Sequence, residues 1–196
     1  SVYWDEDGDF LKTAPQIQIP AEVGYKTYYY LTDGVYADES EGEGWCDSDA
    51  NIVDTEFTPG VAAWFKSVSA DGLATVSGAV SSESTMTVSC PIGFALRANT
   101  FPLAVTLNTD AMTSEDITGV YWDEDGDFLK TAPQIQIPAE VGYKTYYYLL
   151  DGVDANENEA PGWCDSDANL VSTVIPAGQG FWTKGVSGAF TLKFTK

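Results

Sequence analysis

Apolar and polar residues alternate in short runs along most of this chain, the pattern expected of β-strands that bury one face. In one run, Ile17 and Ile19 fall on one side of an extended strand, while Gln16 and Gln18 fall on the other. Similar runs occupy residues 25–31, 85–90, 94–98, 103–107 and 190–194. Glycine, proline, asparagine and aspartate separate the runs at spacings of about ten residues, so the pattern predicts an all-β fold of antiparallel β-sandwich or barrel-like domains.

The sequence also repeats itself. Residues 2–31 return without a change as residues 120–149, at an offset of 118 positions. Beyond the identical block, the motif GWCDSDAN at residues 44–51 recurs at residues 162–169. A fixed period of this kind indicates a repeat protein in which each copy forms one structural unit.

One segment, residues 80–119, occurs only once and lies between the two copies. We therefore expect two tandem β-domains, residues 1–79 and residues 80–196, in which residues 120–196 copy the first domain. If the complete unit is residues 80–119 followed by the repeat, the first domain lacks its front part. It should then expose a sheet edge or an apolar face, which proteins either cover or use to bind another chain.

The charge of the chain narrows the choice of partners. Acidic residues outnumber basic residues by 30 to 9, there is no histidine, and the formal net charge is −21. Such a charge repels nucleic acids and anionic membrane surfaces. The sequence has no apolar run of about eighteen residues that could cross a bilayer. It also has no signal-peptide pattern, although a chain that starts within a repeat resembles a processed or trimmed protein.

Composition and two motifs indicate where the protein works. The chain is rich in acidic, aromatic, threonine, serine and glycine residues, as extracellular and cell-surface proteins of bacteria are. The motifs IGFALRANTFP, at residues 92–102, and IPAGQGFW, at residues 175–182, occur together in the second domain. This pairing resembles uncharacterised secreted bacterial β-sandwich repeat proteins, in which a similar strand precedes a PGxGFW hairpin. The resemblance implies an extracellular β-domain and no particular activity.

Acidic loops provide the candidates for a metal site. The motifs DEDGD and DSDAN each occur twice and place oxygen-bearing side chains at alternate positions, as the start of a calcium-binding loop does. The glutamate that completes an EF-hand loop is absent, so a calcium site here is of another kind. In the alternative interpretation, these side chains bind their own backbone in solvated turns. The candidate Ca²⁺ ligands are Asp5, Asp7, Asp9, Asp47, Asp49, Asn51, Asp123, Asp125, Asp127, Asp165, Asp167 and Asn169.

The three cysteines allow one disulfide. In an exported protein thiols tend to oxidise, and Cys90 and Cys164 both lie in the second domain, so we expect them to pair. Cys46 is the copy of Cys164 and should stay free or bond to another chain. The alternative is that all three are buried thiols.

Aromatic residues and catalytic motifs bear on the class of function. Trp4, Trp45 and Trp64 recur as Trp122, Trp163 and Trp182, and with the neighbouring tyrosines they could stack on sugar rings. They could equally fill a small core or a subunit interface. Without histidine, a nucleophile motif or a phosphate loop, only a pair of carboxylates could catalyse a reaction, so we expect no enzyme.

These features favour a structural protein of an extracellular bacterial assembly, such as a filament, a surface layer or a stalk. We expect a calcium-stabilised chain that polymerises with itself from head to tail. We expect the C-terminal run to contribute to this assembly through Phe190, Leu192 and Phe194, which lie on one face of the strand. The alternative is a carbohydrate-binding surface module whose partner is a polysaccharide. The repeats are nearly identical in their strands and diverge in the acidic loop, which suits packing between chains better than a shared ligand pocket.

Overall fold

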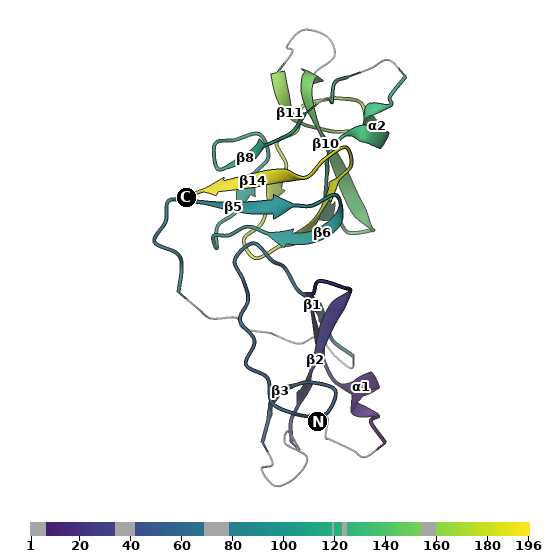
Figure 1. Cartoon of the computed structure of the whole chain (residues 1–196), viewed down its shortest axis with the longest axis vertical. Helices are drawn as coiled ribbons and strands as arrows, with labels where there is room; N and C mark the ends of the chain where they lie inside the picture. The colour runs from purple at the N-terminus through teal and green to yellow at the C-terminus, as the bar shows by residue number, and fades with distance from the viewer. Residues whose placement is uncertain (1–6, 34–41, 69–78, 119, 123–124, 154–159) are drawn as a thin grey trace. The chain divides into compact units, whose positions relative to one another are not determined.

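A computed structural model, shown in Figure 1, describes residues 7–33, 42–68, 79–118, 120–122, 125–153 and 160–196. The chain divides into two compact units, unit 1 (Ser1–Gly78) and unit 2 (Ala79–Lys196). All strand pairs in the described residues are antiparallel, apart from one isolated bridge, and the sheets are open at their edges. The expected all-β class is therefore confirmed, and the barrel alternative is wrong for the described residues.

Unit 1 contains one four-stranded sheet in its described residues, with the strand order β3-β2-β1-β4. Its strands are β1 (Gln16–Pro20), β2 (Tyr25–Leu31), β3 (Gly44–Cys46) and β4 (Trp64–Lys66). A tight turn joins β1 to β2, and its Gly24 has a φ of +71°, a conformation that glycine adopts without strain. With a single sheet, unit 1 is not a sandwich over the residues that the structure describes.

A short helix covers one face of the repeated sheet in each unit. In unit 1, α1 (Phe10–Thr13) places Phe10 against Leu31 and Cys46. In unit 2, α2 (Phe128–Thr131) does the same with Phe128, Leu149 and Cys164. We call this side of each sheet the helix face. Among the described residues, no helix is long and apolar enough to cross a membrane.

Unit 2 builds three sheets from the repeat and the unduplicated segment. The five-stranded sheet has the order β11-β10-β9-β13-β6, and a three-stranded sheet has the order β5-β14-β8. Strands β7 (Val105–Thr106) and β12 (Val174–Ile175) form a small third sheet. The other strands are β5 (Thr85–Cys90), β6 (Gly93–Ala98), β8 (Met112–Glu115), β9 (Gln134–Pro138), β10 (Tyr143–Val153), β11 (Ala160–Cys164), β13 (Gly180–Gly185) and β14 (Phe190–Thr195).

The main core of unit 2 lies between the five-stranded and three-stranded sheets, so this unit is sandwich-like. Inward-facing side chains of both sheets belong to one buried cluster, which also takes in residues of the small sheet. The segment that occurs once supplies β5, β6, β7 and β8, and the repeat supplies the other strands. The buried members of this cluster are Val88, Cys90, Phe101, Val105, Leu107, Met112, Ile135, Ile137, Tyr146, Trp163, Ile175, Phe181, Phe190, Leu192 and Phe194.

The C-terminal strand has a different place from the one expected. Strand β14 is the centre of the three-stranded sheet and pairs with β5 on one side and β8 on the other, as Figure 1 shows. Phe190, Leu192 and Phe194 are all buried in the core of unit 2. The expectation that these three side chains form an assembly surface is therefore wrong. Their alternation was correctly assigned to one face, but the chain covers that face itself.

Candidate functional site

The face of the unit 1 sheet opposite α1 is apolar and aromatic. Cross-strand partners share a face, and here Ile17 is opposite both Tyr28 and Phe65, while Tyr30 is opposite Trp45. The alternation of side chains along each strand adds Ile19 to the same side. We call this surface the open face; its residues are Ile17, Ile19, Tyr28, Tyr30, Trp45 and Phe65.

The equivalent face of unit 2 is covered by protein. Five of the six open-face residues have identical counterparts there, and these five belong to the cluster between the two large sheets or pack against it. Trp163, the counterpart of Trp45, is only 1% exposed, and Ile135, the counterpart of Ile17, is fully buried. Because the described part of unit 1 has no second sheet, Ile19, Tyr28 and Trp45 are only half-buried, although Ile17 itself is 7% exposed.

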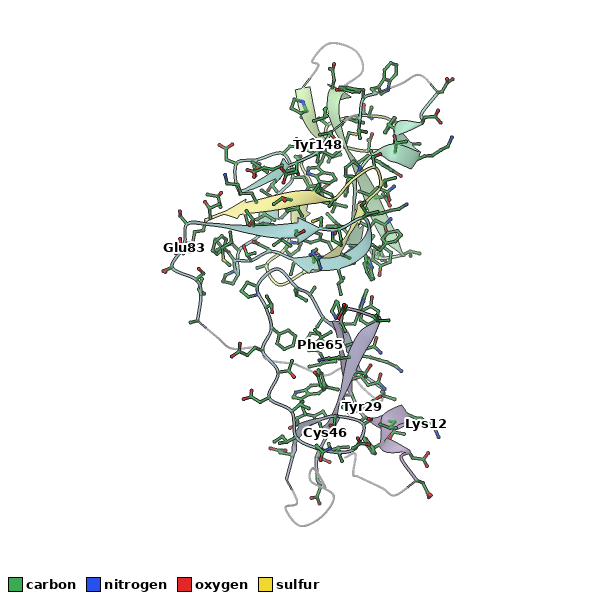
Figure 2. The ribbon with its side chains drawn as sticks, in the orientation of Figure 1. Lys12, Tyr29, Cys46, Phe65, Glu83 and Tyr148 are labelled. Carbon is green, nitrogen blue, oxygen red and sulfur yellow. The ribbon has the colours of Figure 1, made fainter. Side chains whose placement is uncertain are left out.

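The sixth position differs between the repeats. Unit 2 has Thr183, which is buried and donates a hydrogen bond from Oγ1 to the carbonyl oxygen of Ala95 at 3.2 Å. Unit 1 has Phe65, and Figure 2 shows this side chain on the unit 1 sheet, where it is 47% exposed. Unit 1 therefore has the larger and apolar side chain, Phe65, at the position where unit 2 has the buried Thr183. Exposed aromatic groups within an apolar face are a feature of interaction surfaces.

In unit 2, the residues that cover this face form hydrogen bonds with Trp163. The Asn108 side chain accepts a hydrogen bond from the Trp163 backbone N–H at 2.7 Å and donates to the carbonyl oxygens of Trp163 and Val171 at 2.7 and 2.8 Å. The Trp163 indole N–H donates to Ser114 Oγ at 3.1 Å, and its ring lies 6.2 Å from the Phe190 ring centroid. Asn108 and Ser114 thus bind the three polar groups of Trp163, and Phe190 of β14 packs against its ring.

Trp45 keeps the local contacts of its counterpart but not those of the cover. Its ring centroid lies 5.3 Å from that of Tyr30, and its carbonyl oxygen accepts a hydrogen bond from the Val53 N–H at 3.0 Å. In the part of unit 1 that the structure describes, no side chain takes the place of Asn108 or Ser114. Among the described residues, the backbone N–H and the indole N–H of Trp45 therefore lack the partners that Asn108 and Ser114 provide in unit 2.

The edge of the unit 1 sheet is also different. In unit 2, β13 pairs with β9 on one side and with β6 on the other, over six residue pairs from Gly180↔Ala98 to Gly185↔Gly93. In unit 1, β4 pairs with β1 and is the last strand of the sheet among the described residues. The strand that would follow it corresponds to part of the unduplicated segment. An edge strand of this kind is a template for pairing with another chain.

The DSDAN loops are closed hydrogen-bonded turns. Asp47 Oδ1 accepts hydrogen bonds from the backbone N–H groups of Asp49 at 2.9 Å and Asn51 at 3.0 Å. The Asn51 side-chain amide lies 3.3 Å from both carboxylate oxygens of Asp47. Asp165, Asp167 and Asn169 repeat this arrangement. The first aspartate of each loop is thus occupied by N–H donors, which supports the turn interpretation.

The DEDGD loops are not gathered into a metal site either. Asp5 and Asp123 lie outside the described residues. Asp9 forms an exposed ion pair with Lys12 at 2.9 Å, and Asp127 forms one with Lys130 at 2.7 Å. Asp7 and Asp125 are exposed at the start of the helical turn. Among the described residues, no three acidic or cysteine side chains come together in a way that could hold a metal ion.

The turn interpretation makes a prediction about calcium. Replacing Asp165 with alanine should lower the free energy of unfolding of unit 2 by about 1–2 kcal/mol. The backbone N–H groups of Asp167 and Asn169 would lose the carboxylate oxygen that accepts their hydrogen bonds. The loss should be the same in EDTA and in millimolar calcium. Asp167→Ala, at an exposed position of the same turn, is the matched control and should change stability little. Denaturant unfolding measures both variants, and a loss confined to calcium buffer would favour the metal site instead.

The expected Cys90–Cys164 disulfide is absent, although both residues are described. Cys46, Cys90 and Cys164 are buried thiols. The reason is geometric, because Trp163 faces the main core and the next residue, Cys164, therefore faces the helix. Cys90 lies in the main core, on the other side of the five-stranded sheet. Burial raises the pKa of the Cys46 thiol to about 11, with a smaller contribution from Asp47, so this thiol is poorly reactive.

The tryptophans that the structure describes differ in burial and in the face of the sheet on which they lie. Trp163 is buried in the main core, and Trp45 lies on the open face. Trp182 is on the helix-face side of β13, where its ring centroid lies 6.2 Å from that of Phe94. Trp122 is exposed, whereas Trp4 lies outside the described residues. The residues that matter most around Trp163, namely Asn108 and Ser114, were not among the sequence candidates.

Comparisons with known proteins assign no family to this chain. It matches no protein-family model, and no curated protein or solved structure is significantly similar to it. The candidate site is thus defined by the difference between two repeats of the same sequence: one sheet face is covered, and the other is open.

Proposed function

We propose that this chain is a structural subunit of an extracellular assembly, without catalytic activity, and that unit 1 is where it joins another chain. One observation carries the proposal: unit 2 covers these strands with a second sheet, whereas the described residues of unit 1 form no second sheet. Apolar surface gains roughly 25 cal/mol for each Å² removed from water, so covering the open face would drive association.

The other features of the chain agree with a structural role. The DSDAN loops are hydrogen-bonded turns, and the described residues contain no gathered set of metal-binding carboxylates. The net charge of −21 would keep the chain soluble and limit non-specific contacts, while the open face supplies a specific one. Assembly through the C-terminal strand is not part of the proposal, since β14 belongs to the core of unit 2.

The proposal predicts that a charge on the open face prevents association. Phe65→Glu should abolish the concentration-dependent oligomers of the full chain, because it places a carboxylate on the apolar face that the contact would bury. Sedimentation velocity and electron microscopy over a range of concentrations measure the effect. Val23→Glu is the matched control, because Val23 is 90% exposed in the β1–β2 turn of the same unit and outside the open face. That variant should associate as the parent chain does.

Two results would contradict the proposal. The first is a parent chain that stays monomeric at every concentration. The second is a Phe65→Glu chain that associates as strongly as the parent.

A further inference from the structure

We propose that the open face and the β4 edge of unit 1 bind a polypeptide segment with the chemistry of residues 80–118. We call residues 80–118 the cover segment. The inference rests on the proposed function, because it takes unit 1 as a contact surface, and it adds the identity of the group that docks there. Its evidence is the cover segment itself, bound to the same strands in unit 2.

The apolar contacts define the first requirement on the partner. In unit 2, β5 and β8 of the cover segment flank β14 and place Val88, Cys90 and Met112 in the main core. The first repeat has small residues where β14 has its large ones: Gly72, Ala74 and Val76 occupy the positions of Phe190, Leu192 and Phe194 at the offset of 118. These three lie outside the described residues.

The polar contacts define the second requirement. The backbone N–H and C=O of Trp45 have the same orientation as those of Trp163, since both tryptophans pair with the corresponding tyrosine of the neighbouring strand. In unit 2 they are bound by Asn108, which has a φ of +63°. Asparagine is one of the few residues that adopt this conformation readily. A partner segment should therefore carry asparagine in a tight turn, followed by a hydroxyl group within reach of the indole N–H.

The sheet edge defines the third requirement. Strand β6 of the cover segment extends the five-stranded sheet by pairing with β13, and the same addition at β4 would give the unit 1 sheet a fifth strand. This is strand addition, in which main-chain hydrogen bonds give affinity and side-chain pockets give specificity. At the position opposite Phe65, the cover segment has Ala95, which leaves space for the larger ring. A small residue at this position would select the partner.

The test provides the full chain with a second cover segment. Residues 79–119 are added ahead of Val2, joined as residue 119 is joined to Val120, and amide exchange is followed residue by residue by NMR. We expect the Trp45 amide to exchange at least about tenfold more slowly than in the parent chain, approaching Trp163. Amides along the outer edge of β4 should also slow. The same chain with Asn108→Ala in the added copy only is the matched control and should lose most of the Trp45 protection.

A second probe covers the case in which the extended chain fails to fold. A synthetic peptide of residues 91–116 is titrated into the parent chain, and the same amides are followed, with the Asn108→Ala peptide as control. Protection of Trp45 by either probe supports the inference. It is overturned if neither probe changes the exchange of Trp45, if the asparagine is irrelevant to the change, or if parent chains form a two-fold dimer that buries Phe65 of both copies.

The outcomes separate this inference from the proposed function. If parent chains associate through Phe65 but no probe protects Trp45, the proposed function stands and the identity of the partner is wrong. If a probe protects Trp45 in a parent chain that never associates, unit 1 recognises a cover segment but is not an assembly surface in the sense proposed.

Discussion

Replacing Trp163 with alanine should cost unit 2 about 3–5 kcal/mol, enough to unfold it or nearly so, because the change leaves a large cavity in a packed core. The variant also leaves the Ser114 hydroxyl without its indole donor. Trp45→Ala removes the same side chain from the same local sequence in unit 1, where it is only half-buried. We expect this variant to cost unit 1 about 1–2 kcal/mol.

The repeat thus provides its own control. Amide exchange of Ile135 in β9 and of Ile17 in β1, resolved by NMR, reports the stability of each unit within one chain. The two variants differ only in whether a second sheet covers the tryptophan. Equal losses in the two units would mean that Trp45 is as well packed as Trp163, and the open face would no longer be a meaningful description of unit 1.

Local pattern predicted the strands well, because a strand needs only alternating side chains and turn residues that are close in sequence. Residues 16–19, 85–90, 94–98 and 190–194 were all assigned to strands, and the structure has strands there. Their arrangement could not be predicted in the same way. Strand β14 pairs with β5, more than ninety residues earlier, and with β8, and no local signal specifies such partners.

The candidate site shows where a pattern of residues is insufficient. The expectation of an uncovered face in the first repeat came from counting segments, and the described part of unit 1 has such a face. Asn108, by contrast, lies in a polar loop and carries no signal until its contact with Trp163 is known. The difference between Phe65 and Thr183 can be found from the sequence, because aligning the two repeats places a threonine opposite a phenylalanine. The structure adds that the threonine is buried and the phenylalanine is exposed.

The cysteine pairing is wrong for a related reason, whereas calcium binding by the acidic loops stays a prediction. Spacing along the chain does not say which side of a sheet a residue faces, so Cys90 and Cys164 were paired across a sheet that separates them. In the same way, alternate oxygen-bearing side chains fit both a calcium loop and a turn. Only the hydrogen bonds of Asp47 and Asp165 distinguish the two.

Removing residues 190–196 should unfold unit 2 and leave the unit 1 sheet intact. The deletion takes the central strand out of the three-stranded sheet, with the hydrogen bonds to β5 and β8 and three buried side chains, Phe190, Leu192 and Phe194. Each such side chain contributes about 1.5–3 kcal/mol through burial alone, so the total approaches the whole stability of a small domain. Exchange protection should therefore be lost at Ile135 and kept at Ile17.

A graded pair of substitutions tests the same strand without truncation. Leu192→Ala should cost unit 2 about 2–5 kcal/mol, because Leu192 is fully buried between the sheets. Lys193→Ala changes the next residue, which faces outward and forms an exposed ion pair with Glu115 at 3.4 Å, so its cost should stay within about 1 kcal/mol. If the deletion left Ile135 protected, β14 would be dispensable for folding. It would then be available to another chain, and the assembly role that the structure removes from Phe190, Leu192 and Phe194 would return.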